Sequence, residues 1–387
     1  MLTSSNLVGT PGTARRQHRS VVRLLPLDAL TTHDMRRWQR LAHDAASANP
    51  FSEPDFVIPL VDAGLVRREC NVVVVEDVAT SRWIAATVVH ALPSSAKRPL
   101  PRLTAIDSPY TFLDQPLVDA HVTQHALRTM LDSFSGQRQW HGLRFRRQAV
   151  DSPLFSLLRQ QPTESGVHQI CDHTWSRAAV CLNDVSRDQL LSNCSRSRRK
   201  SLRRNRDAAG RQGGMSFRLL WPASDDLHPL ERFLRLENMG WKKSAGTALA
   251  SRPKHQQFFR DMVRRFAQRR AVCFGELMIG DDVIASSCNL VGGDTLFAFK
   301  IGWNPDFSRF SPGYWAEIEL AHAVAQSAPA LRIIDSCSPP GSYTESVWPD
   351  RRAMAASMLV WSRRARMLVA AREYVRMARE PETLLAR

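Results

Sequence analysis

The run Thr295-Leu296-Phe297-Ala298-Phe299-Lys300-Ile301-Gly302, followed nine residues later by Ser311-Pro312-Gly313, decides the fold of this chain. In the first run, bulky residues alternate with small residues and one lysine, which is the period of a β-strand. Lys300 shares the less bulky face with Ala298 and Gly302, so something can approach the backbone there. We therefore predict a strand over 295–302.

The second run predicts the start of a helix. Ser311 is a good N-cap and Pro312 a good first helical residue, while Gly313 leaves the first turn without a screening side chain. Free backbone N–H groups and the helix dipole favour an anion at such a terminus. A pyrophosphate fits that description, and an ordinary strand–loop–helix connection is the alternative interpretation.

Outward from these runs, the second half of the chain is typical of a mixed sheet with helices on its faces. Two glycine-rich turns, Gly280-Asp281-Asp282 and Gly292-Gly293-Asp294, connect three consecutive strands. The predicted strands are 215–221, 271–279, 283–291, 295–302 and 331–335. The predicted helices are 185–206, 228–241, 253–269, the helix after Ser311, and a long helix at the C-terminus.

The first half has helix and strand signals in a similar order, which suggests a duplicated domain. Its predicted strands are 21–25, 72–76, 83–90 and one from 143, and its predicted helices are 32–46 and 118–134. A chain of 387 residues suits two domains of ordinary size. We place these domains at 21–180 and 181–387, after a disordered tail over 1–20.

Composition excludes several classes of protein. The chain is 43% hydrophobic and 23% charged, as in soluble globular proteins, and it has no apolar run long enough to span a bilayer. No apolar segment follows the arginines near the N-terminus, so we expect no signal peptide. Seven cysteines without CxxC spacing argue against a disulfide framework or a zinc site. We expect a cytoplasmic protein without a bound metal and without a membrane span.

The net charge of +16, from 53 basic and 37 acidic residues, predicts attraction to polyanions. The densest cluster is Arg196-Ser197-Arg198-Arg199-Lys200-Ser201-Leu202-Arg203-Arg204-Asn205-Arg206. It is either a solvated helix face or a contact to an anion, such as the 3′-phosphate of coenzyme A (CoA) or an anionic acceptor. It contains no aromatic residue, which argues against base stacking, and we do not expect a nucleic acid to be the target.

Three blocks of sequence resemble one known family. They are 297–313, quoted in part above, Leu236-Glu237-Asn238-Met239-Gly240-Trp241-Lys242-Lys243, and Asp335-Ser336-Cys337 with Trp348 and Arg351-Arg352. In this order, over about 185–355, they resemble the GNAT acyltransferases of the CelD type, which are associated with bacterial cellulose and exopolysaccharide synthesis. Through Asn49-Pro50-Phe51, the first half looks like the degenerate N-terminal GNAT copy of that Fem-like family.

The resemblance implies an α/β fold of two tandem GNAT-like domains, each a mixed, mostly antiparallel sheet flanked by helices. It also implies acetyl-CoA or another acyl-CoA as the donor. The usual pyrophosphate loop, Q/R-x-x-G-x-G/A, corresponds here to Arg309-Phe310-Ser311-Pro312-Gly313-Tyr314, in which only Arg309 and Gly313 fit. Pro312 donates no N–H. The implied donor-binding residues are Phe299, Lys300, Ile301, Arg309, Ser311, Gly313 and Tyr314.

Glu237 is the candidate acid or base. It continues the apolar stripe of the helix 228–241 yet carries a carboxylate, and such a charge requires a partner or a function. The alternative is a salt bridge to Lys242 or to an arginine. By the resemblance, Trp241, Lys242 and Asp335 bind the acceptor substrate.

Tyr343 follows the predicted strand 331–335, where many GNAT enzymes place a tyrosine that protonates the departing thiolate; a plain loop is the alternative. Lys300 is a third candidate in catalysis, as a cation near the CoA phosphates or the acceptor, unless it only extends to the sheet edge. Cys337 lacks a Cys/His motif and is expected to be a packed cysteine.

The predicted function is acyl-CoA-dependent N-acyl transfer, with acetyl transfer to a small-molecule or saccharide amine in cell-surface polysaccharide or envelope metabolism. Two alternatives stay open at this point. One is a Fem-type transferase that takes an aminoacyl group from tRNA, and the other is a non-catalytic GNAT scaffold that binds an anionic partner.

Overall fold

The computed structural model contains two compact units, and each draws on both halves of the chain. Unit 1 comprises Met1–Ser47, Arg67–Thr174 and Ala355–Arg387, and unit 2 comprises Ala48–Val66 and Trp175–Met354. This division differs from the single boundary predicted near residue 180, because 48–66 join unit 2 and the residues from 355 onward join unit 1. The residues that the structure describes are 19–67, 69–96, 98–160, 166–183, 185–239, 246, 248–369 and 371.

Unit 2 is built on a sheet with the strand order β8-β9-β10-β11-β12-β7. Its neighbouring strands pair antiparallel except β11 and β12, which are parallel. The strands are β8 Met215–Leu220, β9 Val272–Ile279, β10 Asp282–Gly292, β11 Thr295–Trp303, β12 Ile333–Asp335 and the second part of β7 His168–Cys181. The predicted three-strand meander is therefore present as β9, β10 and β11.

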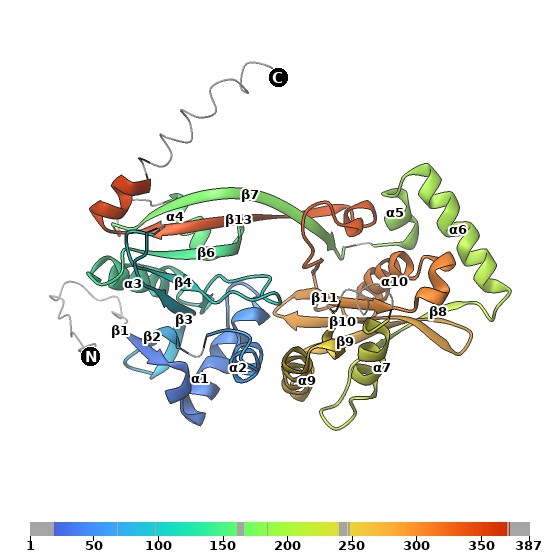
Figure 1. Cartoon of the computed structure of the whole chain (residues 1–387), viewed down its shortest axis with the longest axis horizontal. Helices are drawn as coiled ribbons and strands as arrows, with labels where there is room; N and C mark the ends of the chain where they lie inside the picture. Colours follow the sequence, from blue (N-terminus) through green and yellow to red (C-terminus); the bar gives the residue numbers. More distant parts are fainter. Residues whose placement is uncertain are drawn as a thin grey trace, which may run out of the picture. The chain divides into compact units, whose positions relative to one another are not determined.

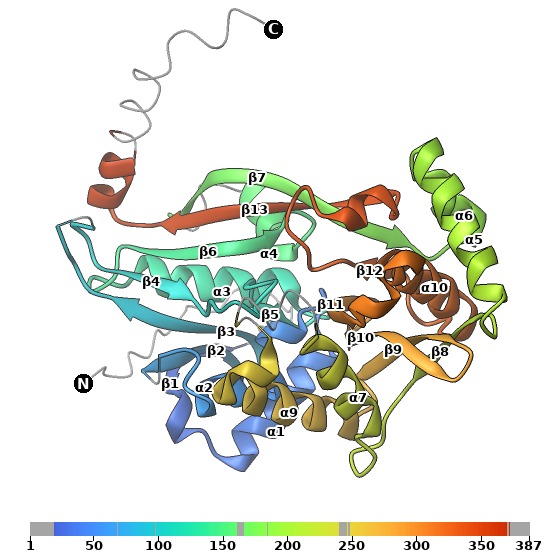
Figure 2. The ribbon, with the colours of Figure 1, turned by 45° about the vertical axis from the view of Figure 1, so that its right-hand side comes forward.

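Helices cover both faces of this sheet (Figures 1 and 2). One face carries α7 (His228–Glu237) and α9 (Pro253–Gln268), and the other carries α10 (Pro312–Ser327). Two further helices, α5 (Arg187–Ser192) and α6 (Arg196–Gly210), precede β8. The single helix predicted over 185–206 is thus broken, because Ser195 caps the start of α6 by accepting a hydrogen bond from the N–H of Arg198.

An early segment of the chain completes the core of unit 2. It contains a 3₁₀ turn, Pro50–Ser52, and helix α2, Pro54–Asp62. The ring of Phe51 lies 5.4 Å from that of Phe297, and the ring of Phe56 lies 5.3 Å from that of Phe258. The Asn49-Pro50-Phe51 segment, which by resemblance belonged to the N-terminal copy, therefore packs beneath β11.

Unit 1 repeats the same strand order, β1-β2-β3-β4-β6-β13, and β7 follows β13. Its strands are β1 Ser20–Pro26, β2 Cys70–Asp77, β3 Arg82–Leu92, β4 Arg102–Ala105, β6 Gly142–Ala149, the latter part of β13 Asp350–Val360, and β5 Leu117–Val118 beside β3. Its helices include α1 Thr32–His43, α3 Thr123–Ser135 and α4 Pro153–Gln160. β4 and β6 are its parallel pair.

The two strand orders correspond position by position, so the prediction of two tandem GNAT-like domains is confirmed at the level of the fold. The sixth position in each order is filled by part of a strand that is divided between the units: the second part of β7 in unit 2 and the latter part of β13 in unit 1. The sequence prediction missed β7, and the long C-terminal helix was wrong over 350–360. That segment is rich in Ala and Met but pairs as a strand, since sheet partners override helix propensity.

Candidate functional site

The parallel pair in unit 2 opens after three residue pairs. Thr295, Leu296 and Phe297 of β11 face Ile333, Ile334 and Asp335 of β12. β12 then ends, whereas β11 continues to Trp303. Beyond Phe297, this edge of β11 has no strand partner within the described ranges. The chain after β12 bends sharply at Cys337, which has a φ of 53°.

A β-bulge lies at this opening. Cys288 of β10 pairs with Lys300 and the next residue, Asn289, pairs with Ala298, so Phe299 is the extra residue. The bulge shifts the alternation of side chains. Ala298 and Ile301 pack on the core beneath α10, whereas the Lys300 charge acts on His255 of α9, on the other face. The prediction that Lys300 shares a face with Ala298 was therefore wrong, because sequence alternation does not account for a bulge.

Gly302 is covered by the protein itself. A Cβ at this position would lie 2.5 Å from the backbone nitrogen of Glu237 and 2.6 Å from its Cα. The glycine thus lets the end of α7 rest directly on β11. The small-residue face expected to admit a ligand instead admits Glu237 at Gly302.

Glu237 is almost fully buried at that contact. Its carboxylate accepts a hydrogen bond from the backbone N–H of Leu249, at 2.8 Å. The structure thus brings Glu237 and Lys300 to the α7–α9 side of the bulged strand. A role for either residue in catalysis stays a prediction. Trp241 and Lys242, predicted to bind the acceptor, lie outside the described residues.

The start of α10 differs from a standard helix cap. Ser311 is the N-cap, as predicted, but it has a left-handed backbone (φ 56°, ψ 51°) and its side chain caps no N–H. Its hydroxyl instead accepts a hydrogen bond from Asn205 of α6, at 3.1 Å. The side-chain capping implied by the sequence was wrong, because α6 provides a tertiary partner for this hydroxyl.

This geometry leaves one free donor in the first turn. The N–H groups of Tyr314 and Trp315 both donate to the Ser311 carbonyl, and Pro312 has no N–H. Only the N–H of Gly313 is then left without a hydrogen-bond partner in the described part of the chain. A Cβ on Gly313 would meet nothing closer than the Trp303 indole and the Tyr343 hydroxyl, both at 3.9 Å. The first turn therefore offers space, one donor and a helix dipole.

Tyr343 and Glu317 form a pair beside that space. The Tyr343 hydroxyl donates to Oε1 of Glu317 at 3.0 Å. Glu317 is only 5% exposed, and its Oε2 has no hydrogen-bond partner among the described residues. Burial raises the pKa of Glu317 to about 7 despite this hydrogen bond. Desolvation of the hydroxyl and the charge of Glu317 raise the pKa of Tyr343 well above its usual value.

A chain of hydroxyl groups holds Tyr343 near the end of β12. Ser336 and Ser338 lie 2.8 Å apart through their hydroxyl oxygens, and Ser338 and Thr344 lie 3.0 Å apart. Thr344 is the neighbour of Tyr343 in a 3₁₀ turn, Tyr343–Ser346. The backbone at Tyr343 thus forms a 3₁₀ turn, and the Tyr343 hydroxyl lies 3.9 Å from the Cβ position of Gly313. Its role in protonating the departing thiolate stays a prediction.

Asp335 lies at the end of β12, where the pairing with β11 stops. It is fully buried, and its Oδ2 contacts Arg177 at 2.6 Å and Arg352 at 2.9 Å. Its Oδ1 accepts from the N–H of Cys337 at 3.0 Å. Burial alone would raise the pKa of Asp335, but the two arginines outweigh it and hold that pKa below its usual value. These contacts give Asp335 a positioning role at the turn, while substrate binding by it stays a prediction.

Cys337 itself is buried, and burial with the adjacent Asp335 charge raises its pKa well above the usual thiol range. Because the thiolate is the reactive form, this cysteine is a poor nucleophile. This environment fits the expectation of a packed cysteine.

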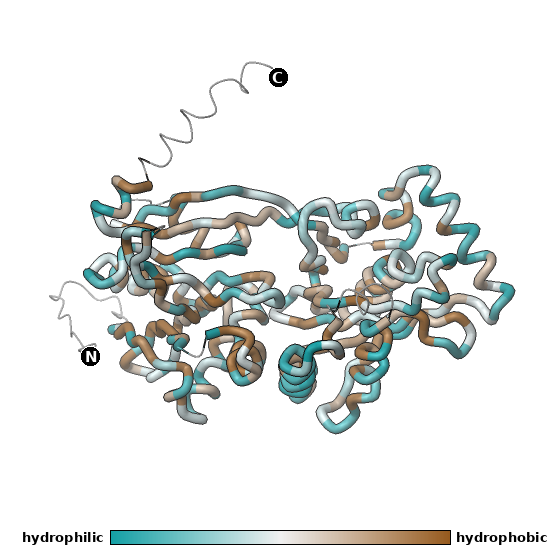
Figure 3. The backbone as a smooth tube through the Cα atoms, in the orientation of Figure 1, coloured by the Kyte–Doolittle hydropathy of each residue, from teal (hydrophilic) through white to brown (hydrophobic). Residues whose placement is uncertain are grey.

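The basic helix α6 lies alongside the start of α10. The Arg198 guanidinium lies 4.8 Å from the Tyr314 ring centre, and that of Arg309 lies 4.7 Å from the Phe310 ring centre. Both arginines are exposed, and no ion pair involves either within the described ranges. Other cations of α6, including Arg203 and Arg204, are exposed, and much of the helix is coloured as hydrophilic in Figure 3. The helix thus has a packed face as well as the solvated face that was predicted.

Sequence reasoning missed Glu317, Arg198 as an individual residue, and Asn205. A signal existed for Glu317, since two glutamates interrupt an otherwise apolar helix, Trp315-Ala316-Glu317-Ile318-Glu319-Leu320. No group of three or more metal-ligating side chains occurs in the described residues, and no helix among them is long and apolar enough to cross a membrane.

Comparison with known proteins agrees with this geometry. Residues 196–337 match the family model for the acetyltransferase (GNAT) domain. No curated protein matches the chain. The solved structure of FemX covers 84% of this chain and 95% of its own, with a TM-score of 0.51 and 9% identity.

Two further solved structures have the same fold. A conserved protein of unknown function from Bacteroides thetaiotaomicron covers 87% of this chain and 99% of its own (TM-score 0.50, 11% identity). The C-terminal domain of a putative lysylphosphatidylglycerol synthetase from Agrobacterium fabrum covers 89% and 96% (TM-score 0.50, 11% identity). The chain therefore has a tandem GNAT-like fold, and residues 196–337 are the part that matches the acetyltransferase domain.

Proposed function

We propose that this protein is an N-acyltransferase that moves an acyl group from acetyl-CoA or another acyl-CoA to an amine. The observation that carries the proposal is the opening between β11 and β12, which begins beside Asp335 and extends toward the free N–H of Gly313. By the resemblance to CelD-type enzymes, the acceptor belongs to cell-surface polysaccharide or envelope metabolism.

The start of α10 fits the phosphates of the donor. The Gly313 N–H and the helix dipole favour an anion, and the absence of a side chain leaves room for one. Arg198 and Arg309 supply positive charge beside Tyr314 and Phe310. The stretch of β11 beyond the end of β12 is then where we place the thioester.

The transfer itself needs two proton movements. The amine nitrogen attacks the thioester carbon and passes a proton to a base, for which Glu237 is the candidate. The C–S bond then breaks, and the departing thiolate takes a proton from the Tyr343 hydroxyl. Glu317, 3.0 Å from that hydroxyl and with a pKa of about 7, is placed to restore the proton.

Isothermal titration with CoA, acetyl-CoA and longer acyl-CoAs tests the donor. We expect saturable binding of CoA, with the preferred acyl chain identified by the tightest acyl-CoA. If no CoA species binds while the protein is folded, the acyl-CoA proposal is wrong, and a non-catalytic scaffold becomes the better explanation.

A Fem-type transferase using aminoacyl-tRNA is the second candidate, favoured by the exposed cations of α6, including Arg203 and Arg204. RNA that copurifies with the protein, and an RNA affinity that falls steeply with salt, would support it. The likeness to FemX is in the fold alone, so it does not decide between the two donors.

A further inference from the structure

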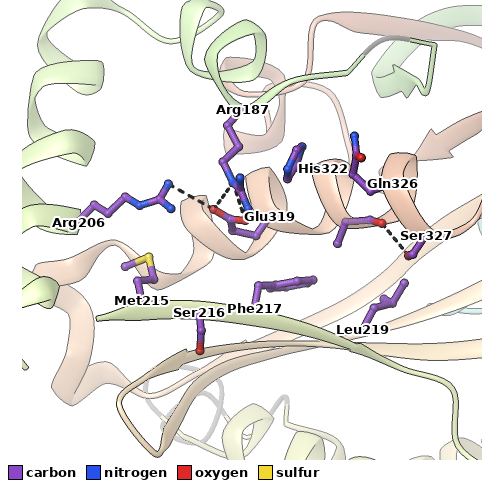
Figure 4. Close-up of a pocket in the computed structure, with 11 residues that line it drawn as sticks. Arg187, Arg206, Met215, Ser216, Phe217, Leu219, Glu319, His322, Gln326 and Ser327 are labelled. Atoms are coloured by element: carbon purple, nitrogen blue, oxygen red, sulfur yellow. Dashed lines mark hydrogen bonds and ion pairs between the residues drawn. The ribbon is translucent and has the colours of Figure 1, made fainter. Parts of the chain in front are cut away.

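Unit 2 contains a cavity of about 420 Å³ between the later turns of α10 and the edge strand β8 (Figure 4). The cavity is distinct from the donor opening. Its lining on α10 extends from Glu319 to Ser327, whereas the donor site uses Gly313 at the helix start. Because a helix rises 1.5 Å per residue, Ser327 lies roughly 20 Å along the axis from Gly313. The volume of the cavity is within the usual range for small-molecule sites.

One wall of the cavity carries a surplus of positive charge. Glu319 is buried, and the Arg187 guanidinium contacts both of its oxygens at 2.8 to 2.9 Å. Arg206 adds a single long contact to Glu319, at 3.5 Å, and lies over the Trp315 ring. Two guanidinium groups thus share one carboxylate, so one positive charge is left over. About 40% of each arginine side chain is exposed, so both have N–H groups available to a further anion.

The remaining walls combine apolar side chains with Ser216, Gln326 and Ser327, and they include one buried polar atom without a partner in the described residues. Met215, Phe217 and Leu219 of β8 pack on the core from one side of the cavity. The Phe217 ring approaches Gly275, because a Cβ there would lie 2.6 Å from the tip of the ring, and the ring lines the cavity. On α10, Nδ1 of His322 is buried and has no hydrogen-bond partner in the described residues. A buried nitrogen without a partner is costly, which points to a polar ligand.

From these observations we infer that the cavity binds a small amphipathic carboxylate, whose anionic end meets Arg187, Arg206 and His322 and whose apolar body lies on Phe217. The carboxylate would receive charge-assisted hydrogen bonds from the two arginines. The apolar body would cover the floor formed by β8. This second site does not depend on the proposed acyltransferase activity.

Titration of the full-length protein with phenylacetate, phenylacetamide and acetate tests the inference. We expect phenylacetate to bind, and the neutral amide to bind at least about tenfold more weakly, since it lacks the charge that the arginines recognise. Acetate should also bind about tenfold more weakly, because it lacks the apolar body. Equal affinity for the amide, or no binding of phenylacetate, overturns the proposal.

Two variants locate the site. Arg187→Gln should weaken phenylacetate binding about tenfold, and Ala323→Leu should do the same by filling the cavity without removing a charge. The second variant keeps the test valid if the loss of Arg187 prevents folding. Arg204→Gln, on the exposed face of α6, is the matched control and should bind like the wild type. Unchanged binding in Ala323→Leu, or competition by saturating CoA, would place the ligand elsewhere and refute the assignment.

Discussion

The two parallel strand pairs, β4–β6 in unit 1 and β11–β12 in unit 2, have the same place in the topology but opposite surroundings. In unit 1, Asp114 accepts the backbone N–H groups of both Arg146 and Arg147 on β6. In unit 2, β11 continues to Trp303 after β12 ends at Asp335, and the N–H of Gly313 has no hydrogen-bond partner among the described residues. A protein carboxylate thus accepts backbone N–H groups beside the parallel pair of unit 1, whereas one backbone N–H of the α10 helix start stays available in unit 2.

The helices after the first strand of each pair differ in the same way. Just before α3 in unit 1, Asp119 accepts the N–H of His121 and pairs with Arg82. At the start of α10, no carboxylate accepts an N–H. Among the described residues, the start of α10 thus leaves one backbone donor available, whereas the segment before α3 supplies its own acceptor.

The largest effect is expected at the helix start of unit 2. Gly313→Glu introduces a carboxylate and bulk where the phosphates of CoA are proposed to lie, so the CoA affinity should fall at least about 100-fold. The melting temperature shift caused by CoA should disappear. The fold should persist, since an acidic residue in the first turn suits the helix dipole.

The matched variant in unit 1 is Gln124→Glu, at the same second position of α3. It should leave CoA binding unchanged and the stoichiometry at one CoA per chain. If CoA raises the melting temperature of Gly313→Glu as much as that of the wild type, or no longer raises that of Gln124→Glu, the proposed difference between the units is wrong.

Glu237→Gln should lower turnover by roughly 10²-fold, the usual effect of losing one acid or base. The amide still has an oxygen to accept the Leu249 N–H, so CoA affinity should hardly change. Arg235→Gln, at an exposed position of the same helix, controls for changes in α7. If Glu237→Gln loses stability while the turnover of folded enzyme is kept, Glu237 has a structural role only.

The buried carboxylates Glu317 and Asp114 should respond differently to neutralisation. Because the folded-state pKa of Glu317 is raised to about 7, the folded protein binds the extra proton. The stability that this proton provides is present below the unfolded-state pKa near 4.5 and is lost as the pH rises through 7. Glu317→Gln should therefore be more stable than the wild type at pH 8, by up to roughly 3 kcal/mol, with little difference at pH 5.

Asp114→Asn should lower stability at both values of pH, although the pKa of Asp114 is also raised, to about 6. The asparagine has one acceptor oxygen for two backbone N–H groups, so one of them loses its partner. Denaturant titrations at pH 5 and pH 8 measure both variants, with Asp281→Asn in an exposed turn as a control. If Glu317→Gln and Asp114→Asn change the free energy of unfolding in the same direction at pH 8, the proposed difference between the two units is contradicted.

The smallest effect is expected on α6. Arg198→Gln should weaken CoA binding by only a few-fold, the effect expected of an exposed charge, and Arg204→Gln should not weaken it. If Arg198 contacts the 3′-phosphate, its variant should bind dephospho-CoA as the wild type does. If Arg198, Arg199, Arg203 and Arg204 instead hold RNA, replacing them with Gln should make the salt dependence shallower by about 0.7 to 0.9 per lost contact.

The amino-acid sequence by itself determined the local elements near the site. The turns at Gly280 and Gly293 have φ values of 56° and 53°, which glycine adopts without strain, so the meander of β9, β10 and β11 was predictable. Pro312 likewise marked the start of α10. These features depend on a few adjacent residues, and residue type is sufficient to indicate them.

Only the tertiary structure decided how these elements form a site. The bulge at Phe299 places the Lys300 side chain on the other face of the sheet from the one predicted. Asn205, 106 positions away in the sequence, donates a hydrogen bond to the Ser311 hydroxyl, which therefore does not cap α10. Tyr343 met Glu317 across 26 positions, and β7 and β13 exchanged between the units. Such contacts depend on packing between distant segments, and no local pattern of residue types encodes which distant group will be the partner.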